Sequence, residues 1–213
     1  MRIRREGRIV RATLDRPPVN ALDTAAYRWL SAACAAVRPD ECLLIDAAGR
    51  VFSAGHDRGE PPGGESLAAG AAALTAVLRC PAPVVVAAQG PAIGAGALLL
   101  AAADVPLIAS DAWLKLPELD VGVTVGHAIL SRLVPPALAS RALLTSEQIP
   151  ADVLTTALVH PSDGLPGAAV EAARAVLAKP PDLVSLARRS WGERERAAAA
   201  YEAEVAAFQA HGS

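Results

Sequence analysis

Residues 83–103 form a stretch without a charged side chain that contains three glycines. The β-branched run at residues 84–88 predicts a buried strand, and the alanine- and leucine-rich run at residues 95–103 predicts a buried helix. Gly90 and Pro91 interrupt the two runs, so a strand, a turn and a helix explain the stretch better than a membrane span. A chain of 213 residues with 53% hydrophobic residues can build the core that such a unit requires.

The same alternation extends to both sides of this stretch. Further strands are predicted at residues 8–14, 42–46 and 105–109, and further helices at residues 22–37 and 65–79. Asp23 or Thr24 would cap the first of these helices. Only helices are predicted after Gly126, at residues 128–133, 138–144, 151–159, 168–178 and 183–210, with Pro180 and Pro181 marking the last boundary. We therefore expect an α/β fold with a parallel, helix-covered sheet and a helical C-terminal region.

The charge balance excludes some classes of partner. With 20 basic and 22 acidic residues the net charge is -2, so the chain lacks the general positive field that attracts nucleic acid or membrane surfaces. The arginine-rich residues 2–8 and 188–196 are interpreted as solvated faces, with contact to ligand phosphates as the alternative. We expect neither nucleic acid nor a membrane as a partner.

Cysteine and histidine usage points to a reduced, metal-free protein. The cysteines at positions 34, 42 and 80 are odd in number and lie in apolar surroundings, which is typical of buried thiols rather than of a disulfide or zinc framework. No histidine, cysteine and carboxylate spacing resembles a metal site. The basic N-terminus is not followed by the apolar core of a signal peptide, so a cytoplasmic location is expected.

Two glycine-containing turns follow predicted strands, at residues 52–57 and 90–96. Neither matches the dinucleotide fingerprint or a phosphate-binding loop. Such turns can aim backbone amides at a ligand oxygen, because glycine leaves room and a helix start offers unpaired N–H groups. They can also serve only as spacers between a helix and a sheet. The spacing alone leaves both interpretations open.

Several motifs in fixed order resemble the crotonase, or enoyl-CoA hydratase/isomerase, superfamily. The motifs are LDRPPVNAL at residues 14–22, GRVFSAGHD at 49–57, PVVVAAQGPAIGAG at 83–96, Ala103-Asp104 and LPELDVG at 116–122, with weaker similarity at 140–149 and 157–159. The resemblance implies the ClpP/crotonase fold, a spiral of ββα units that binds an acyl-CoA thioester. It also implies a homotrimer or a dimer of trimers, and coenzyme A as part of the substrate rather than as a separate cofactor.

The resemblance divides the chain into two parts of one structural unit. Residues 1–135 would form the spiral core with the thioester site, and residues 136–213 would form a helical region for trimerisation and cover. The family has a further helical stretch for which this sequence shows no counterpart after Gln209, so a shortened cover is expected. The loop at residues 58–66, RGEPPGGES, is also short where relatives often carry a longer helical cover.

The site implied by the resemblance combines backbone donors with one carboxylate. The amides of His56 and Ala95 would hold the thioester oxygen as an oxyanion hole. Of the two glutamates used by the hydratases of this family, the first falls on Leu98 and the second on Glu118. A single glutamate is also the pattern of the Δ3,Δ2-enoyl-CoA isomerases in this superfamily.

Other positions carry secondary roles in this interpretation. Leu98 and Gly126 would line the acyl pocket, while Ala54 and Asp57 would contact coenzyme A, with Asp57 also fixing its own turn. His127 would be a possible second acid or base, or else a helix-start residue that faces solvent.

The chemistry of a lone carboxylate leaves three functions open. Shifting a double bond needs one base that removes a proton from C2 and returns it at C4, whereas adding water often uses two carboxylates. If Glu118 faces an apolar pocket its pKa should be raised; the alternative is a cap or an ion pair with Lys115. The protein is therefore expected to be an enoyl-CoA isomerase of lipid metabolism, or a hydratase or biosynthetic relative with another acid or base, or a non-catalytic acyl-CoA-binding protein.

Overall fold

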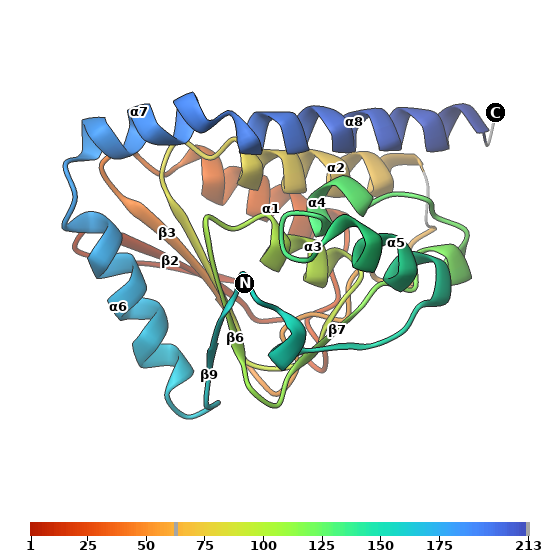
Figure 1. Ribbon diagram of the computed structural model, residues 1–213, viewed down its shortest axis with the longest axis horizontal. Helices are drawn as coiled ribbons and strands as arrows, with labels where there is room; N and C mark the ends of the chain where they lie inside the picture. Colours follow the sequence, from red (N-terminus) through yellow and green to blue (C-terminus); the bar gives the residue numbers. More distant parts are fainter. Residues whose placement is uncertain (62–63, 212–213) are drawn as a thin grey trace.

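The computed structural model describes residues 1–61 and 64–211, which form a mixed α/β fold (Figure 1). The described residues build a six-stranded sheet in the order β1-β2-β3-β4-β6-β9. Its strands are β1 (Arg2–Glu6), β2 (Ile9–Leu14), β3 (Cys42–Ala47), β4 (Val84–Ala88), β6 (Val105–Ala109) and β9 (Leu158–His160). All pairs are parallel except β1 with β2. A smaller sheet joins β5 (Ala92–Ile93), β7 (Trp113–Lys115) and β8 (Ile149–Pro150).

Helices cover the main sheet and extend beyond it. Helix α6 (Leu165–Leu177) packs against β3, β4 and β6, and α3 (Ala95–Ala101) lies on the other side of the strands (Figure 1). Helix α1 (Thr24–Ala35) packs on α2 (Gly64–Leu78), and Asp23 caps α1 by accepting a hydrogen bond from the Ala26 amide at 2.7 Å. These elements confirm the strand and helix alternation predicted for the first half of the chain.

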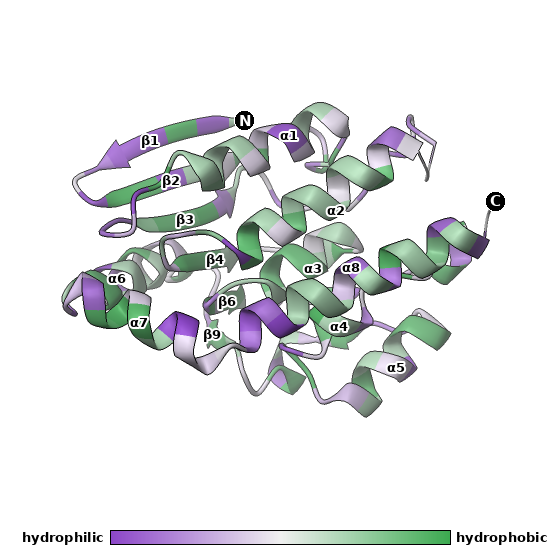
Figure 2. Cartoon of the chain, turned by 90° about the horizontal axis from the view of Figure 1, so that it is seen from above, coloured by the Kyte–Doolittle hydropathy of each residue, from purple (hydrophilic) through white to green (hydrophobic). Residues whose placement is uncertain are grey.

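The C-terminal helices run along one side of the molecule. Helix α7 (Pro181–Trp191) and α8 (Glu193–His211) follow each other along the top of Figure 1 and meet at an angle that is visible in Figure 2. Helix α8 packs on α2 and on α4 (His127–Leu130). The boundary predicted at the proline pair is confirmed, because Pro181 is the first residue of α7. The single helix predicted over residues 183–210 is wrong, since Gly192 separates two helices with φ of 64°.

The second half also contains strands that the sequence did not predict. Residues 151–159, expected to be a helix, form the short η2 turn (Ala151–Val153) and β9 instead, because Leu158 and Val159 pair with β6 at the sheet edge. Helix α5 (Pro136–Thr145) is followed by β8, so the region after Gly126 is not purely helical.

At the other end of the chain, strand β1 was missed because all five of its residues are exposed and show no alternation. Its antiparallel pairing with β2 also means that the main sheet is mixed rather than parallel throughout.

The glycine- and proline-rich loop predicted at residues 58–66 is only partly described. Pro62 and Gly63 lie outside the described residues, and α2 already begins at Gly64, so the end of this stretch is helical rather than a loop. The three cysteines are free and buried, as expected. None of the helices in the described ranges has the length and apolar content needed to span a bilayer.

The second arginine-rich stretch is only partly a solvated face, because Arg189 and Arg196 are exposed whereas its other two arginines are not. Arg188 and Arg194 each place a guanidinium nitrogen 3.1 Å from Asp104 Oδ2, and both side chains are nine-tenths buried or more. Asp104 also accepts the Val84 amide at 2.7 Å, so this cluster connects α7 and α8 to the start of β4. The ion pairs therefore hold the C-terminal helices on the core.

Candidate active site

The two glycine-containing turns predicted from the sequence lie side by side. The Ile93 amide donates to the Ser53 carbonyl at 2.9 Å, and Ser53 and Ala92 form a β-bridge. A Cβ on Gly55 would lie 2.6 Å from the Ile93 carbonyl oxygen, and a Cβ on Gly96 would lie 2.7 Å from the Ser53 carbonyl oxygen. Glycine is therefore required at both positions for the turns to approach this closely.

Hydrogen bonds from the segment around Asn20 hold the first glycine-containing turn, at residues 52–57, in place. The Asn20 side-chain amide donates to the carbonyls of Ala48 and Val51 at 2.8 and 2.9 Å, and its side-chain oxygen accepts the Arg16 amide. The Ser53 hydroxyl donates to the Asn20 carbonyl at 2.8 Å. The asparagine of the LDRPPVNAL motif therefore positions the turn that carries the His56 amide.

Two backbone amides remain available where the turns meet. Among the described residues, neither the His56 amide nor the Ala95 amide donates to a protein acceptor, although the neighbouring Asp57 amide donates to Leu22 and the Gly94 amide to Lys115. Ala95 is the first residue of α3, where amides lack a helical partner and the helix dipole is positive. His56 and Ala95 line the same cavity. Two such donors can donate hydrogen bonds to the oxygen of a thioester.

Glu118 faces the cavity from the segment after β7. Its side chain is 8% exposed, and its Oε2 atom has no hydrogen-bond partner among the described residues. Burial raises its pKa from 4.5 to about 7. The alternative of an ion pair with Lys115 is wrong, because no ion pair in the described residues includes Glu118. The alternative of a helix cap is also wrong, because the Glu118 side chain makes no capping hydrogen bond to the following η1 turn (Leu119–Val121).

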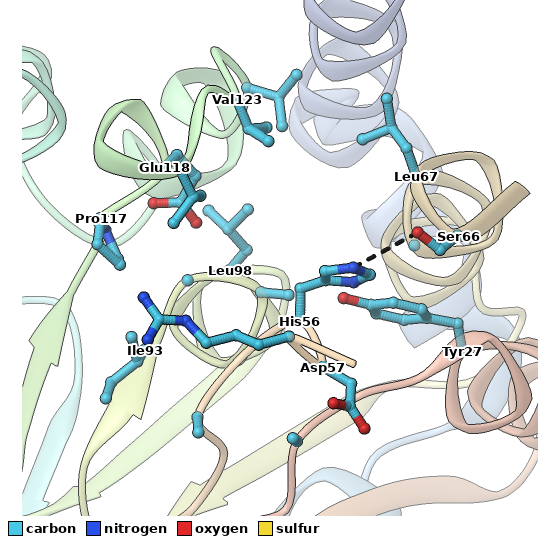
Figure 3. A pocket seen from close by; sticks show the side chains of 18 of the residues that line it. Tyr27, His56, Asp57, Ser66, Leu67, Ile93, Leu98, Pro117, Glu118 and Val123 are labelled. Atoms are coloured by element: carbon cyan, nitrogen blue, oxygen red, sulfur yellow. Dashed lines mark hydrogen bonds between the residues drawn. The ribbon is translucent and has the colours of Figure 1, made fainter. Parts of the chain in front are cut away.

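The cavity has a volume of about 890 Å³ and a largely apolar wall (Figure 3). Leu98 of α3 lines it beside Glu118, and its side chain is 2% exposed. Gly126 lies behind Leu98 rather than in the wall, since a Cβ on Gly126 would be 3.0 Å from Leu98 Cδ1. Other apolar lining residues are Leu67, Leu74, Ile93, Val123 and Val125.

The remaining residues singled out from the sequence separate into two groups. Ala54 and Asp57 line the cavity; Asp57 accepts the Gly59 amide at 2.8 Å and pairs with Arg16 at 2.5 Å. The Gly59 bond is the main reason that the pKa of Asp57 is lowered. His127 does not line the cavity, and its Nε2 lies 3.0 Å from the hydroxyl of Ser140 on α5.

Two tyrosines that the sequence pattern does not single out also line this cavity. Tyr27 comes from α1 and Tyr201 from α8, and each is 3% exposed. The ring of Tyr27 stacks on the ring of His56 with a centroid separation of 6.2 Å and an interplanar angle of 10° (Figure 3). No spacing signal identifies them, because aromatic residues on amphipathic helices usually belong to the core. Among the described residues, no group of three or more potential metal ligands occurs.

Comparison with known proteins identifies the family. The model of the enoyl-CoA hydratase/isomerase family matches residues 4–211. The chain therefore belongs to this family, which is part of the crotonase superfamily. The expected α/β crotonase fold with a helical C-terminal region is confirmed by solved structures. An enoyl-CoA hydratase/isomerase from Mycobacterium paratuberculosis shares 28% identity, with a TM-score of 0.85 over 97% of this chain and 92% of that chain.

Other relatives differ in the reactions that their names describe. An enoyl-CoA isomerase from Mycobacterium tuberculosis shares 26% identity, with a TM-score of 0.86 over 98% of this chain and 97% of that one. A (7aS)-7a-methyl-1,5-dioxo-2,3,5,6,7,7a-hexahydro-1H-indene-carboxyl-CoA hydrolase from M. tuberculosis is 33% identical over 85% of this chain and 79% of its own. A carnitinyl-CoA dehydratase from Salmonella arizonae is 34% identical over 71% of this chain, which spans 63% of that relative.

Proposed function

We propose that this protein is an enoyl-CoA isomerase that shifts a double bond from the 3,4 to the 2,3 position. Glu118 removes a proton from C2, the electron pair moves onto the thioester oxygen as a dienolate, and the same carboxyl returns the proton at C4. The observation that carries the proposal is a single buried carboxylate, with a pKa raised to about 7, in the cavity that the two unpartnered amides line.

The amides of His56 and Ala95 would act as the oxyanion hole. Charge develops on the thioester oxygen as the proton leaves C2, and a fixed N–H donor stabilises that charge more than it stabilises the neutral carbonyl. Removing one such donor typically costs about 3 to 4 kcal/mol of transition-state stabilisation. Both groups are backbone amides, so their position depends on the glycine turns rather than on their own side chains.

Leu98 supports an isomerase over a hydratase. An alkyl side chain beside Glu118 neither activates water nor moves a proton, and it helps to keep the cleft dry. The open cavity and the inward-facing Glu118 support turnover rather than binding alone. The proposed reaction needs no cofactor beyond the coenzyme A that the substrate carries, which Ala54 and Asp57 would contact.

The second candidate is removal or addition of water, or another crotonase reaction. It is favoured by the carnitinyl-CoA dehydratase and the CoA hydrolase among the relatives. That chemistry would need a second acid or base, and the histidine considered for this role, His127, faces Ser140 outside the cavity wall.

We further propose a cytoplasmic homotrimer or dimer of trimers. The exposed apolar residues Leu183, Leu186 and Trp191 on α7 support an interface there, because exposed apolar patches commonly mark contacts between subunits.

The experiment that tests the function incubates the purified protein separately with a 3-enoyl-CoA and with the corresponding 2-enoyl-CoA. The proposal expects a conjugated 2-enoyl product from the first substrate and no hydrated product from either. Glu118→Gln should lower the isomerisation rate by at least about 100-fold, because general acid–base groups typically contribute 100-fold or more. Equal rates in both proteins would show that Glu118 is not the base, and a 3-hydroxyacyl product would favour the second candidate.

A further inference from the structure

The only two tyrosines of the sequence both face the candidate active-site cavity, although they come from helices far apart in the chain. Tyr27 lies on α1 and Tyr201 on α8, and both side chains are almost completely buried. In the part of the chain that the structure describes, neither hydroxyl has a hydrogen-bond partner. Neither hydroxyl oxygen is among the fully enclosed unpartnered atoms, so both keep accessible surface, which the cavity that they line provides.

The ring of Tyr27 is held from two sides. A Cβ on Gly70 of α2 would lie 3.3 Å from Tyr27 Cζ, so this glycine lets α2 approach the ring closely. On another side the ring stacks on His56, the residue whose amide is proposed to hold the thioester oxygen (Figure 3). These contacts fix the position of the ring and therefore the direction of its hydroxyl.

The position of Tyr201 depends on the contacts that fix helix α8. One turn later on α8, the Glu204 carboxylate accepts the amides of Gly126 and Ala128, both at 2.7 Å. Helix α8 also packs along α2, which lies between α1 and α8 (Figure 2). The two hydroxyls are thus presented by packed helices rather than by mobile loops, which favours a specific ligand contact.

Water can solvate each hydroxyl when the cavity holds no ligand, and a ligand oxygen can replace that water whereas a methylene cannot. Burial raises the pKa of both tyrosines above the ordinary value of 10, so both hydroxyls stay protonated at neutral pH. Each can therefore donate a hydrogen bond to a ligand oxygen. A plain hydrocarbon chain offers no such oxygen.

We propose that the acyl group of the substrate carries a ketone oxygen remote from the thioester, and that Tyr27 and Tyr201 recognise it by donating hydrogen bonds. The substrate class would then be an oxo-acyl-CoA. This inference rests on the proposed use of the cavity as an acyl-CoA site, but it does not depend on which reaction follows.

Binding of unreactive matched ligands tests the inference without turnover. Calorimetry would compare 5-oxohexanoyl-CoA with hexanoyl-CoA and 4-oxopentanoyl-CoA with pentanoyl-CoA, pairs in which one methylene becomes a carbonyl. In the wild-type protein we expect the oxo ligand of at least one pair to bind about tenfold more tightly, as one well-made hydrogen bond allows. Equal affinity, or weaker binding of both oxo ligands, would overturn the inference.

Variants assign the preference to the hydroxyls. Tyr27→Phe and Tyr201→Phe should each reduce the oxo preference several-fold, and the double variant should abolish it without weakening binding of the hydrocarbon ligand. Thr75→Val is the control, because it removes a fully enclosed, unpartnered hydroxyl from a residue that does not line the cavity. Its preference should equal that of the wild type. A preference that survives in the double variant, or that Thr75→Val also loses, would contradict the assignment to the tyrosines.

The outcome separates this inference from the proposed function. If the protein binds oxo-acyl-CoA selectively but does not isomerise 3-enoyl-CoA, the substrate class stands and the isomerase assignment fails. If it isomerises 3-enoyl-CoA but shows no oxo preference in either ligand pair, the isomerase assignment stands and the substrate class is wrong.

Discussion

Gly94 leaves open the space that the Glu118 carboxylate borders: a Cβ on Gly94 would lie 2.9 Å from Glu118 Oε1. The same glycine has a φ of 52° and immediately precedes Ala95, whose amide is unpartnered among the described residues. One residue thus sets the distance between the proposed oxyanion donor and the proposed base. A change at Gly94 should consequently disturb both the Ala95 amide and the Glu118 carboxylate.

Gly94→Ala should lower kcat/KM for isomerisation by about 100-fold, because a shift of the carboxylate on the order of 1 Å is enough for a loss of that size. Steady-state kinetics with a 3-enoyl-CoA would measure this loss. Gly7→Ala is the matched control, since Gly7 also has a positive φ, of 63°, but nothing lies within 4 Å of its added Cβ. Wild-type activity in Gly94→Ala, or an equal loss in Gly7→Ala, would show that the Glu118 contact does not cause the effect.

The pH profile of kcat/KM should report the raised pKa of Glu118. The base must be ionised in the free enzyme, so kcat/KM should rise about tenfold per pH unit below the midpoint and level off above it. The midpoint should lie at about pH 7 rather than at the ordinary glutamate value of 4.5. A profile that is flat from pH 5 to pH 8 would show that the ionisation of Glu118 does not control the rate.

Glu118 should also destabilise the fold at neutral and alkaline pH. Below pH 4.5 the carboxyl is protonated in both the folded and unfolded chains, so its burial carries no charge penalty. Between pH 4.5 and about pH 7 only the unfolded chain loses the proton, and the free energy of unfolding falls by about 3 kcal/mol. Urea denaturation should therefore show that Glu118→Gln is more stable than the wild type at pH 8 and similar to it at pH 4. Equal stability at both pH values would argue against a raised pKa.

Most of what positions the site could be predicted from the sequence. The β-branched run at Val84–Ala88 predicts a buried strand, and the glycines after it predict a turn. The motifs in their order predict the positions of Glu118 and of the two amides in the site. Strand β9 was missed because Leu158 and Val159 become a strand only by pairing with β6, a long-range contact that local pattern does not encode. The tyrosines were missed for the same reason, since only the packing of α1, α2 and α8 brings them to one cavity.

His127→Ala should leave isomerisation within about twofold of the wild type, because the imidazole contacts Ser140 rather than the cavity. This variant tests the second acid or base considered from the sequence. The same kinetic assay applies, with Glu118→Gln as the inactive reference. A loss of 100-fold or more with His127→Ala would place the imidazole in the reaction and favour the hydratase candidate.

Glu204→Ala should destabilise the protein by about 1 to 2 kcal/mol, because two amides at the start of α4 lose their acceptor. Thermal or urea unfolding would measure the change. Glu202→Ala is the comparison from the same helix. Its exposed pair with Arg79 should contribute less than about 1 kcal/mol. An equal loss of stability in both variants would show that the hydrogen bonds from the two α4 amides to Glu204 contribute no more than an exposed ion pair.

Transfer of a single proton is the central claim, and an isotope label follows that proton directly. A 3-enoyl-CoA that carries deuterium at C2 would be converted in ordinary water, and the product analysed by mass spectrometry and NMR. If the buried Glu118 carries the proton from C2 to C4, part of the deuterium should appear at C4 of a 2-enoyl product that contains no oxygen from water. Complete loss of the label to solvent, or a product with oxygen from water, would contradict this account.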